Sequence, residues 1–289
     1  MVNTARRRTA EGVAFLLAGG FFIQWSSAVI QAAFTVLGPS AASAWRVTVG
    51  AIVLCCVVRP RVRSWTRDQW MAAAALGLST MLMNQCFYQC IARIPLGGAV
   101  AIEYLGPFMV AALGRRTWRH GVFVLLAGAG VIAITRPGSG LNVLGVLFGL
   151  GSGLFWALYM FASARVGRAT RGFEGLAVSM SIAAVVSLPL SLGRLPQVMD
   201  HPSVLGRVAV VALMAIVLGF GAEMQAMRRL RPAVAGVLMA TEPAIALLVG
   251  WMLLAQVPTF WDVVGIVAVV IAGAGVTWDT DPGDLEVPQ

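Results

Sequence analysis

Four ionisable side chains lie inside stretches of the chain that otherwise have the composition of membrane spans: Arg46, Glu103, Glu223 and Glu242. An ionisable group in hydrocarbon costs roughly 2.5 to 3.5 kcal/mol on insertion scales, so it usually faces a protein interior or a polar pathway. A carboxylate can exchange protons, and a guanidinium can grip a carboxylate through two parallel hydrogen bonds. We therefore expect these residues to mark the functional region.

Prolines follow two of the carboxylates. Pro107 lies four residues after Glu103, and a proline removes the hydrogen bond to the carbonyl group four residues before it. Pro243 similarly frees the carbonyl group of Met239, next to Glu242. Polar backbone at membrane depth is tolerated where it is buried in protein or lines a cavity. The sequence therefore predicts two kinked helices, each with a carboxylate at the kink.

Arg46 has two interpretations. It is either the buried counter-charge of Glu103 or a fork that binds a substrate carboxylate. A cation and an anion a few ångströms apart would suit a zwitterionic amino acid. A carboxylate withdrawn from water can also exchange protons at physiological pH, so we expect proton coupling at Glu103 first and at its counterpart Glu242 second.

For Glu223 the structural interpretation is favoured. It lies near the cytoplasmic end of its span, close to Arg228 and Arg229, so we expect snorkelling or a surface ion pair.

Polar and aromatic residues complete the expected binding site. Asn84 and Tyr88 are four residues apart and therefore share a helix face. Gln24, Trp156 and Tyr159 are further candidates, although amides also join helices and aromatic rings also mark membrane interfaces. The glycines Gly145, Gly149 and Gly153 indicate close helix packing rather than a phosphate loop.

Signatures of enzymes and ATP-driven pumps are missing from the sequence. It contains no G-x-S-x-G, H-E-x-x-H or G-x-x-x-x-G-K-[ST] motif, and its four cysteines include no C-x-x-C pair. We expect no catalytic residue, no cofactor and no metal. The net charge of +9 comes from arginines between apolar segments, not from one basic face, so nucleic acid is not an expected partner.

The elements that carry these residues are expected to be membrane helices. The chain has 289 residues, of which 59% are hydrophobic and 11% charged, against about 25% charged in soluble proteins. A span needs about 20 apolar residues. The candidate spans, ten in all, are 12–34, 40–58, 70–91, 95–113, 120–136, 142–162, 173–193, 205–226, 233–254 and 260–278.

The arginines predict the orientation. With the N-terminus inside, the cytoplasmic segments hold Arg6 to Arg8, Arg59 to Arg67, Arg115 to Arg119, Arg165 to Arg171 and Arg228 to Arg231; the outer segments hold Arg93, Arg136, Arg194 and Arg207. Cytoplasmic loops of membrane proteins carry the excess of positive charge. Both termini, including the acidic tail 279–289, are therefore expected in the cytoplasm.

An internal repeat is expected as well. Gly128-Ala129-Gly130-Val131 recurs as Gly273-Ala274-Gly275-Val276, and Pro107 and Pro243 lie at matching places. Five spans per half give the two halves opposite orientations, which is a transporter architecture with its site between the halves. We expect an all-α membrane protein with repeats over 12–136 and 142–278.

The residues also resemble a known family. Ile94 to Pro107 (IPLGGAVAIEYLGP), Met83 to Tyr88 (MNQCFY) and Met239 to Ala244 (MATEPA) are similar to the threonine and homoserine exporter branch of the EamA-type drug/metabolite transporter superfamily. The resemblance covers about Gln24 to Trp278. Two departures are Gln31, where the branch can carry lysine, and Leu254-Ala255-Gln256, where the superfamily usually has Leu-Gly-Glu.

The resemblance implies ten helices in two inverted repeats, in a bacterial inner membrane, exporting small metabolites. It implies roles for Gln24, Arg46, Asn84, Tyr88, Glu103, Trp156, Tyr159, Glu223 and Glu242. We expect a secondary transporter for amino acids such as threonine or homoserine, with the oligomeric state left open. The alternatives are an exporter of lipophilic cationic drugs and, from another class, an intramembrane enzyme or lipid-handling protein.

Overall fold

Helices make up nearly all of the structure. The computed structural model describes residues 2–114, 118–134, 142–170, 173–227, 229–230 and 232–278. The helices of the first half of the chain are α1 (Val2–Gln31), α2 (Phe34–Val58), the 3₁₀ turn η1 (Val62–Ser64), α3 (Arg67–Ile91), α4 (Leu96–Glu103), α5 (Leu105–Gly114) and α6 (Trp118–Ile134). Those of the second half are α7 (Val143–Ala169), α8 (Glu174–Leu192), α9 (Leu195–Asp200), α10 (Pro202–Leu213), the π-helix η2 (Met214–Phe220), α11 (Gly221–Met227), α12 (Pro232–Met239), α13 (Glu242–Leu254) and α14 (Phe260–Trp278).

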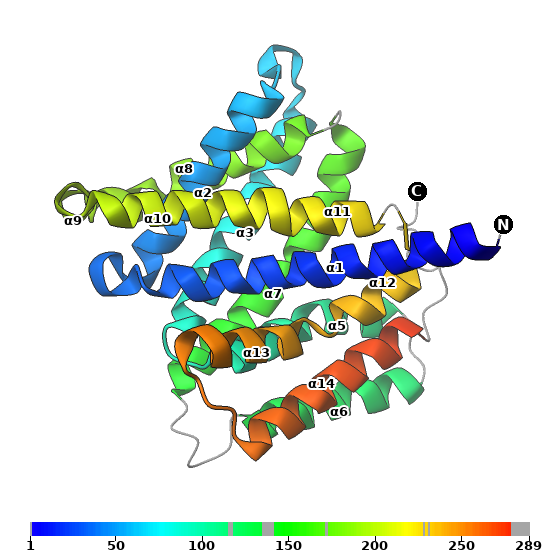
Figure 1. Ribbon diagram of the computed structural model, residues 1–289. Coiled ribbons are helices and arrows are strands. Elements are labelled where there is room, and N and C mark those ends of the chain that lie inside the picture. Colours follow the sequence, from blue (N-terminus) through cyan, green and yellow to red (C-terminus); the bar gives the residue numbers. More distant parts are fainter. Residues whose placement is uncertain are drawn as a thin grey trace.

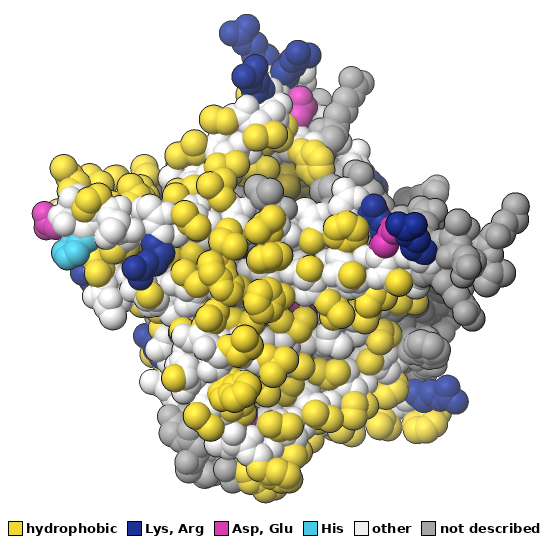
Figure 2. All heavy atoms as spheres, in the orientation of Figure 1, with side chains coloured by type: hydrophobic (Ala, Val, Ile, Leu, Met, Phe, Trp, Pro, Cys, Tyr) yellow, Lys and Arg dark blue, Asp and Glu magenta, His cyan; other side chains and the backbone are white. Residues whose placement is uncertain are grey.

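The chain is a multi-pass membrane protein, and its all-α fold confirms the prediction. Among the described residues, five helical stretches are long and apolar enough to cross a membrane: Thr9–Gln31, Phe34–Val58, Val143–Ala169, Glu174–Leu192 and Val234–Leu254. Several shorter apolar helices accompany them. Hydrophobic side chains cover the middle of one face of the molecule, and arginines lie toward its edges (Figure 2).

Some helix ends differ from the predicted span limits. Helix α1 begins at Val2 rather than at residue 12, and α7 continues to Ala169 rather than ending at 162. Helix α2 begins at Phe34 rather than at 40, because a short helical piece precedes the kink at Gly38, where φ is 73°. The predicted limit at residue 136 lies outside the described residues.

Two helices are interrupted where the prolines predict it. Helix α4 ends at Glu103 and α5 begins at Leu105, while α12 ends at Met239 and α13 begins at Glu242. In both places Pro107 and Pro243 lack the backbone N–H that would bond to the carbonyl group four residues earlier. The predicted pairing of a carboxylate with a helix break is confirmed.

A few contacts between helices organise the bundle. Helix α3 packs against α7 and α8, α2 against α8, α6 against α14, and α4 against α13. Helix α1 lies between the α10–α11 run and the α12–α13 run (Figure 1). Glycines permit close approaches between helices: a Cβ atom at Gly130 would lie 2.6 Å from the carbonyl oxygen of Gly265, and one at Gly265 would lie 2.5 Å from that of Gly130.

Candidate functional site

Glu103 lies in the protein interior at the break between α4 and α5. Glu103 is 9% exposed, and its carboxylate accepts a hydrogen bond from the hydroxyl group of Ser152 on α7. The same hydroxyl oxygen lies 3.1 Å from the carbonyl oxygen of Met83 on α3. Ser152 is fully buried. It therefore joins Glu103 to two neighbouring helices.

Glycines bring the backbone of α7 onto the same break. A Cβ atom at Gly153 would lie 2.7 Å from the carbonyl oxygen of Glu103, and one at Gly106 would lie 1.9 Å from the carbonyl oxygen of Gly153. Any side chain at either position would collide with backbone. The interpretation of Gly153 as a close-packing residue is confirmed, and its closest contact is the carbonyl group that Pro107 leaves without its helical donor.

Glu242 occupies the second break in a comparable way. It is the first residue of α13 and is 5% exposed. Its Oε2 accepts a hydrogen bond of 2.7 Å from Nε2 of Gln24 on α1. The two carboxylates thus follow one pattern: the donor to Glu103 comes from the second half of the chain, and the donor to Glu242 comes from the first.

Of the two interpretations of Arg46, the ion pair with Glu103 is not formed. Nη1 of Arg46 donates to Oδ1 of Asn84 at 3.0 Å, and its guanidinium carbon lies 5.8 Å from the ring centroid of Tyr88. The amide of Asn84 is held in turn by its bond to the carbonyl oxygen of Thr80. Glu103 takes a neutral donor instead of the guanidinium. Arg46 is half-buried, and among the described residues no carboxylate contacts it.

Asn84 and Tyr88 lie on one face of α3, as predicted, and both meet Arg46. Tyr88 is fully buried, and its hydroxyl group lies near the guanidinium of Arg46 but makes no hydrogen bond of good geometry among the described residues. An unpartnered buried hydroxyl group costs about 1 to 3 kcal/mol. A ligand held by Arg46 could supply the missing partner.

The two aromatic candidates on α7 have different surroundings. Trp156 packs edge-on against Tyr104, with ring centroids 4.7 Å apart and an interplanar angle of 87°. Because Tyr104 follows Glu103, this pair flanks the first break. Tyr159 instead packs with Leu76 and Val166 where α3 meets α7.

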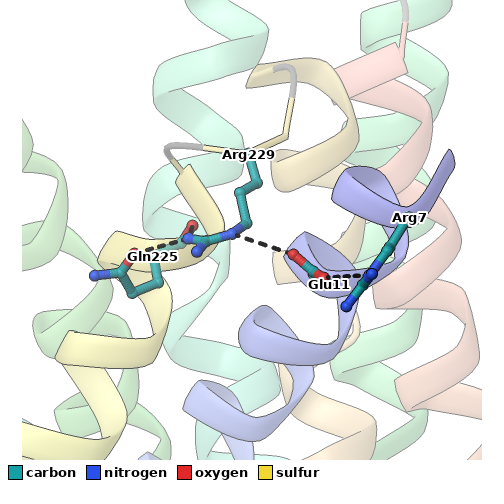
Figure 3. A network of polar contacts seen from close by, with 4 residues as sticks. All are labelled: Arg7, Glu11, Gln225 and Arg229. Atoms are coloured by element: carbon teal, nitrogen blue, oxygen red, sulfur yellow. Dashed lines mark hydrogen bonds and ion pairs between the residues drawn. The ribbon is translucent and has the colours of Figure 1, made fainter. Parts of the chain in front are cut away.

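Glu223 does not form an ion pair with Arg229, which was one of the partners considered for it. Arg229 bonds to Oε1 of Gln225 at 2.7 Å and forms a contact of 3.9 Å with Glu11, which also pairs with Arg7 (Figure 3). Arg228 lies outside the described residues. The side chain of Glu223 instead packs on α1, where a Cβ atom at Gly19 would lie 2.9 Å from its Cγ.

Ser152 and Tyr104 are the site residues that the sequence-based prediction missed. Gly149, Ser152 and Trp156 follow one another at helical spacing, so they share a face of α7 with the carboxylate site. This spacing was a usable signal, because a serine on a face of packing glycines approaches the neighbouring backbone closely.

Comparisons with known proteins show what the whole chain is similar to. Residues 143–278 match the EamA-like transporter family. The threonine/homoserine exporter RhtA of Salmonella typhimurium is 30% identical over 258 residues, which are 88% of this chain and 87% of that protein. RhtA of Escherichia coli K12 is 29% identical over 268 residues, or 92% and 90% of the two chains. A protein of known crystal structure shares the fold with a TM-score of 0.61 and 19% identity, covering 91% of this chain and 96% of its own.

Proposed function

Because this chain belongs to the EamA-like transporter family, we propose that it exports amino acids such as threonine and homoserine across a bacterial inner membrane. The protein is a transporter and not an enzyme. The observation that carries the proposal is the pair of buried carboxylates at helix breaks, Glu103 and Glu242, together with an arginine that no carboxylate of the described residues neutralises. Two relatives that match most of the chain are threonine/homoserine exporters.

The proposed architecture has ten crossings in two inverted repeats, 12–136 and 142–278. In it α4 and α5 form the fourth crossing, α10 to α11 the eighth, and α12 and α13 the ninth. The contacts support this symmetry: the packing of α3 on α7 corresponds to that of α11 on α1, and the pairs α2–α8 and α6–α14 are each related to themselves.

Both termini are proposed to be cytoplasmic. In support, α1 begins and α14 ends at the same side of the bundle (Figure 1), and the arginine-rich segments follow the positive-inside rule. The tail 279–289 lies outside the described residues and is proposed to be cytoplasmic too.

The substrate is proposed to bind as a zwitterion. Arg46 binds its carboxylate, with Asn84 orienting the guanidinium and the free hydroxyl group of Tyr88 donating to the same ligand. Glu103 receives the ammonium group, and Gln24, Trp156 and Tyr159 complete the lining. Arg46 and Glu103 lie on two helices of the first half, whereas Trp156 and Tyr159 lie on α7 of the second half. The lining therefore includes residues of both halves, as alternating access requires.

Proton coupling follows from the same carboxylates. A protonated Glu103 is neutral and has no charge with which to hold an ammonium group, whereas the ionised form attracts one. A proton and a substrate therefore compete for Glu103, which is the condition for exchange. Glu242 is its counterpart in the second half.

Liposomes containing the purified protein test this function. Labelled threonine or homoserine should move faster when a pH gradient is imposed, and the Arg46→Gln and Glu103→Gln variants should lose this transport while still inserting. Asp68→Asn, at an exposed position at the start of α3, is the control that should transport normally. Normal transport by Arg46→Gln would refute the proposed binding mode.

A second candidate is an exporter of lipophilic cations. The aromatic pair of Tyr104 and Trp156 beside Glu103 favours it, because aromatic faces attract cations. Cells that express the protein should be protected from homoserine if the first proposal holds, and from quaternary ammonium compounds if the second does. Arg46→Gln separates the two further, because it should abolish amino acid export and leave cation export intact.

A further inference from the structure

Helix α1 carries two consecutive glycines that face two different carboxylates. A Cβ atom at Gly19 would lie 2.9 Å from Cγ of Glu223 on α11, and one at Gly20 would lie 2.7 Å from Oε1 of Glu242 on α13. Helix α1 lies between these two helices (Figure 1). Consecutive residues of a helix are about 100° apart around its axis. The absence of side chains at both glycines therefore lets the two carboxylates approach the same turn of α1 at neighbouring positions.

Among the described residues, no positively charged side chain contacts Glu223 or Glu242. Within the described part of the chain, neither Glu223 nor Glu242 forms an ion pair, and the first described arginine after α11, Arg229, is occupied by Gln225 and Glu11. The groups that interact electrostatically with Glu223 are Glu242, Tyr104 and Tyr159, and Glu103 acts on Tyr104 as well. All of them are acidic or neutral.

Gln24 supplies an independent sign that a hydrogen-bond donor is missing. The residue is 4% exposed, and its Nε2 donates to Glu242. Its Oε1, on the same amide group and so next to that carboxylate, has no donor among the described residues. A buried acceptor without a donor is costly. A protonated carboxyl group beside it would supply the O–H that this oxygen lacks.

The helix that carries Glu223 is also unusual at this place. The π-helix η2 ends three residues before Glu223, and a Cβ atom at Gly219 would lie 2.7 Å from Cγ1 of Ile23 on α1. Gly219 and Glu223 thus both lie against α1. π-helical turns occur frequently at functional sites, because the extra residue in the turn re-aims the side chains around it.

From this geometry we propose that Glu223 and Glu242 share one proton across α1, with Gln24 as the third member of the site. The proposal deepens the proposed function and rests on it for the use made of the proton. When a proton from water binds, one O–H bond forms on a carboxylate oxygen and the charge of the pair falls from two negative charges to one. Release of the proton to water restores both charges.

Carbodiimide labelling of the purified protein in detergent tests the shared proton. Dicyclohexylcarbodiimide reacts with protonated carboxyl groups in apolar surroundings, and peptide mass spectrometry identifies the modified residue. Within this pair we expect one adduct for each molecule, on Glu223 or on Glu242 but not on both, whether or not Glu103 is labelled as well. In Glu223→Gln the labelling of Glu242 at neutral pH should fall by about tenfold, because the charge that favours its proton is gone. In Glu242→Gln the labelling of Glu223 should fall likewise.

Controls make the result specific to this pair. Glu11 lies on α1, where it forms an exposed contact with Arg7. The Glu11→Gln variant should be labelled to the same extent as the unchanged protein. Glu223→Asp keeps a carboxyl group and should retain labelling of Glu242. For each variant, a monodisperse profile in size-exclusion chromatography confirms that the protein is folded.

Three outcomes would overturn the proposal: labelling of Glu242 that Glu223→Gln leaves unchanged, adducts on both residues of one molecule, and loss of labelling on adding sodium ions at constant pH. The last would identify a metal cation as the ligand. The labelling needs neither substrate nor a sealed compartment. A protein that is labelled as expected but does not export amino acids would therefore contradict only the proposed function and not the shared proton.

Discussion

Ser152 shows how one hydroxyl group positions the carboxylate at the first helix break. It donates to Glu103 and is fully buried. In Ser152→Ala the carboxylate loses its donor, so the free energy of unfolding should fall by about 1 to 3 kcal/mol and export should slow. Thermal unfolding in detergent and efflux from liposomes measure the two effects.

Ser187 provides a matched control for this change. It is equally buried, but its hydroxyl group bonds only to the carbonyl oxygen of Ala184 in its own helix. Ser187→Ala should therefore leave export unchanged. Equal losses of export in both variants would mean that Ser152 acts through packing and not through Glu103.

Ala255 is strained where the superfamily usually has glycine. It ends α13 with φ of 52° and ψ of 28°, a left-handed conformation that costs a residue with a Cβ atom about 1 to 2 kcal/mol. The next residue, Gln256, accepts a hydrogen bond from the backbone N–H of Leu96 at the start of α4. The turn thus connects the two interrupted helices, and Gln256 keeps an acceptor where the superfamily has glutamate.

Ala255→Gly should therefore stabilise the protein. Removing the Cβ atom relieves the strain, although glycine also makes the unfolded chain more flexible. We expect the free energy of unfolding to rise by up to about 1 kcal/mol as the net effect. Melting temperature in detergent measures it. The reverse result, a loss of stability as large as that of Ala129→Gly within helix α6, would show that the left-handed turn carries no strain.

At the level of helices, the contact between α5 and α7 keeps the first break in place. Gly153→Ala would bring a Cβ atom to 2.7 Å from the carbonyl oxygen of Glu103, and backbone cannot yield as a flexible side chain can. The helices should separate, moving Glu103 away from Ser152. We expect export to fall by at least about tenfold, as misplacement of a binding group by about 1 Å commonly causes.

The control for this helix contact is Gly128→Ala. Gly128 lies in α6, and no atom of the described residues lies within 4 Å of the place that a Cβ atom there would take. Alanine also favours helix by about 1 kcal/mol over glycine. Export by this variant should match that of the unchanged protein. If both alanine variants export normally, the close approach of α7 to the break is not needed for function.

The sequence predicted those features that depend on local chemistry. The breaks after Glu103 and Met239 follow from proline lacking an N–H group, and Asn84 and Tyr88 share a face because of helical periodicity. The sequence left two interpretations of Arg46 open, because its partner depends on how α2, α3 and α4 pack. The π-helix before Glu223 has no local signal. Snorkelling or a surface ion pair was expected for Glu223 because Arg228 and Arg229 lie near it in the sequence.

For the whole molecule, the inverted arrangement makes a prediction about which surfaces face the cytoplasm. In a cysteine-free background, a single cysteine at Ser64 between α2 and α3 should be protected from an impermeant maleimide in intact cells. One at His201 between α9 and α10 should react. Both positions are exposed, so reactivity reports the side of the membrane. The reversed pattern would place both termini outside. Reaction at both positions in intact cells would mean an even number of crossings between them, against the five that two inverted repeats require.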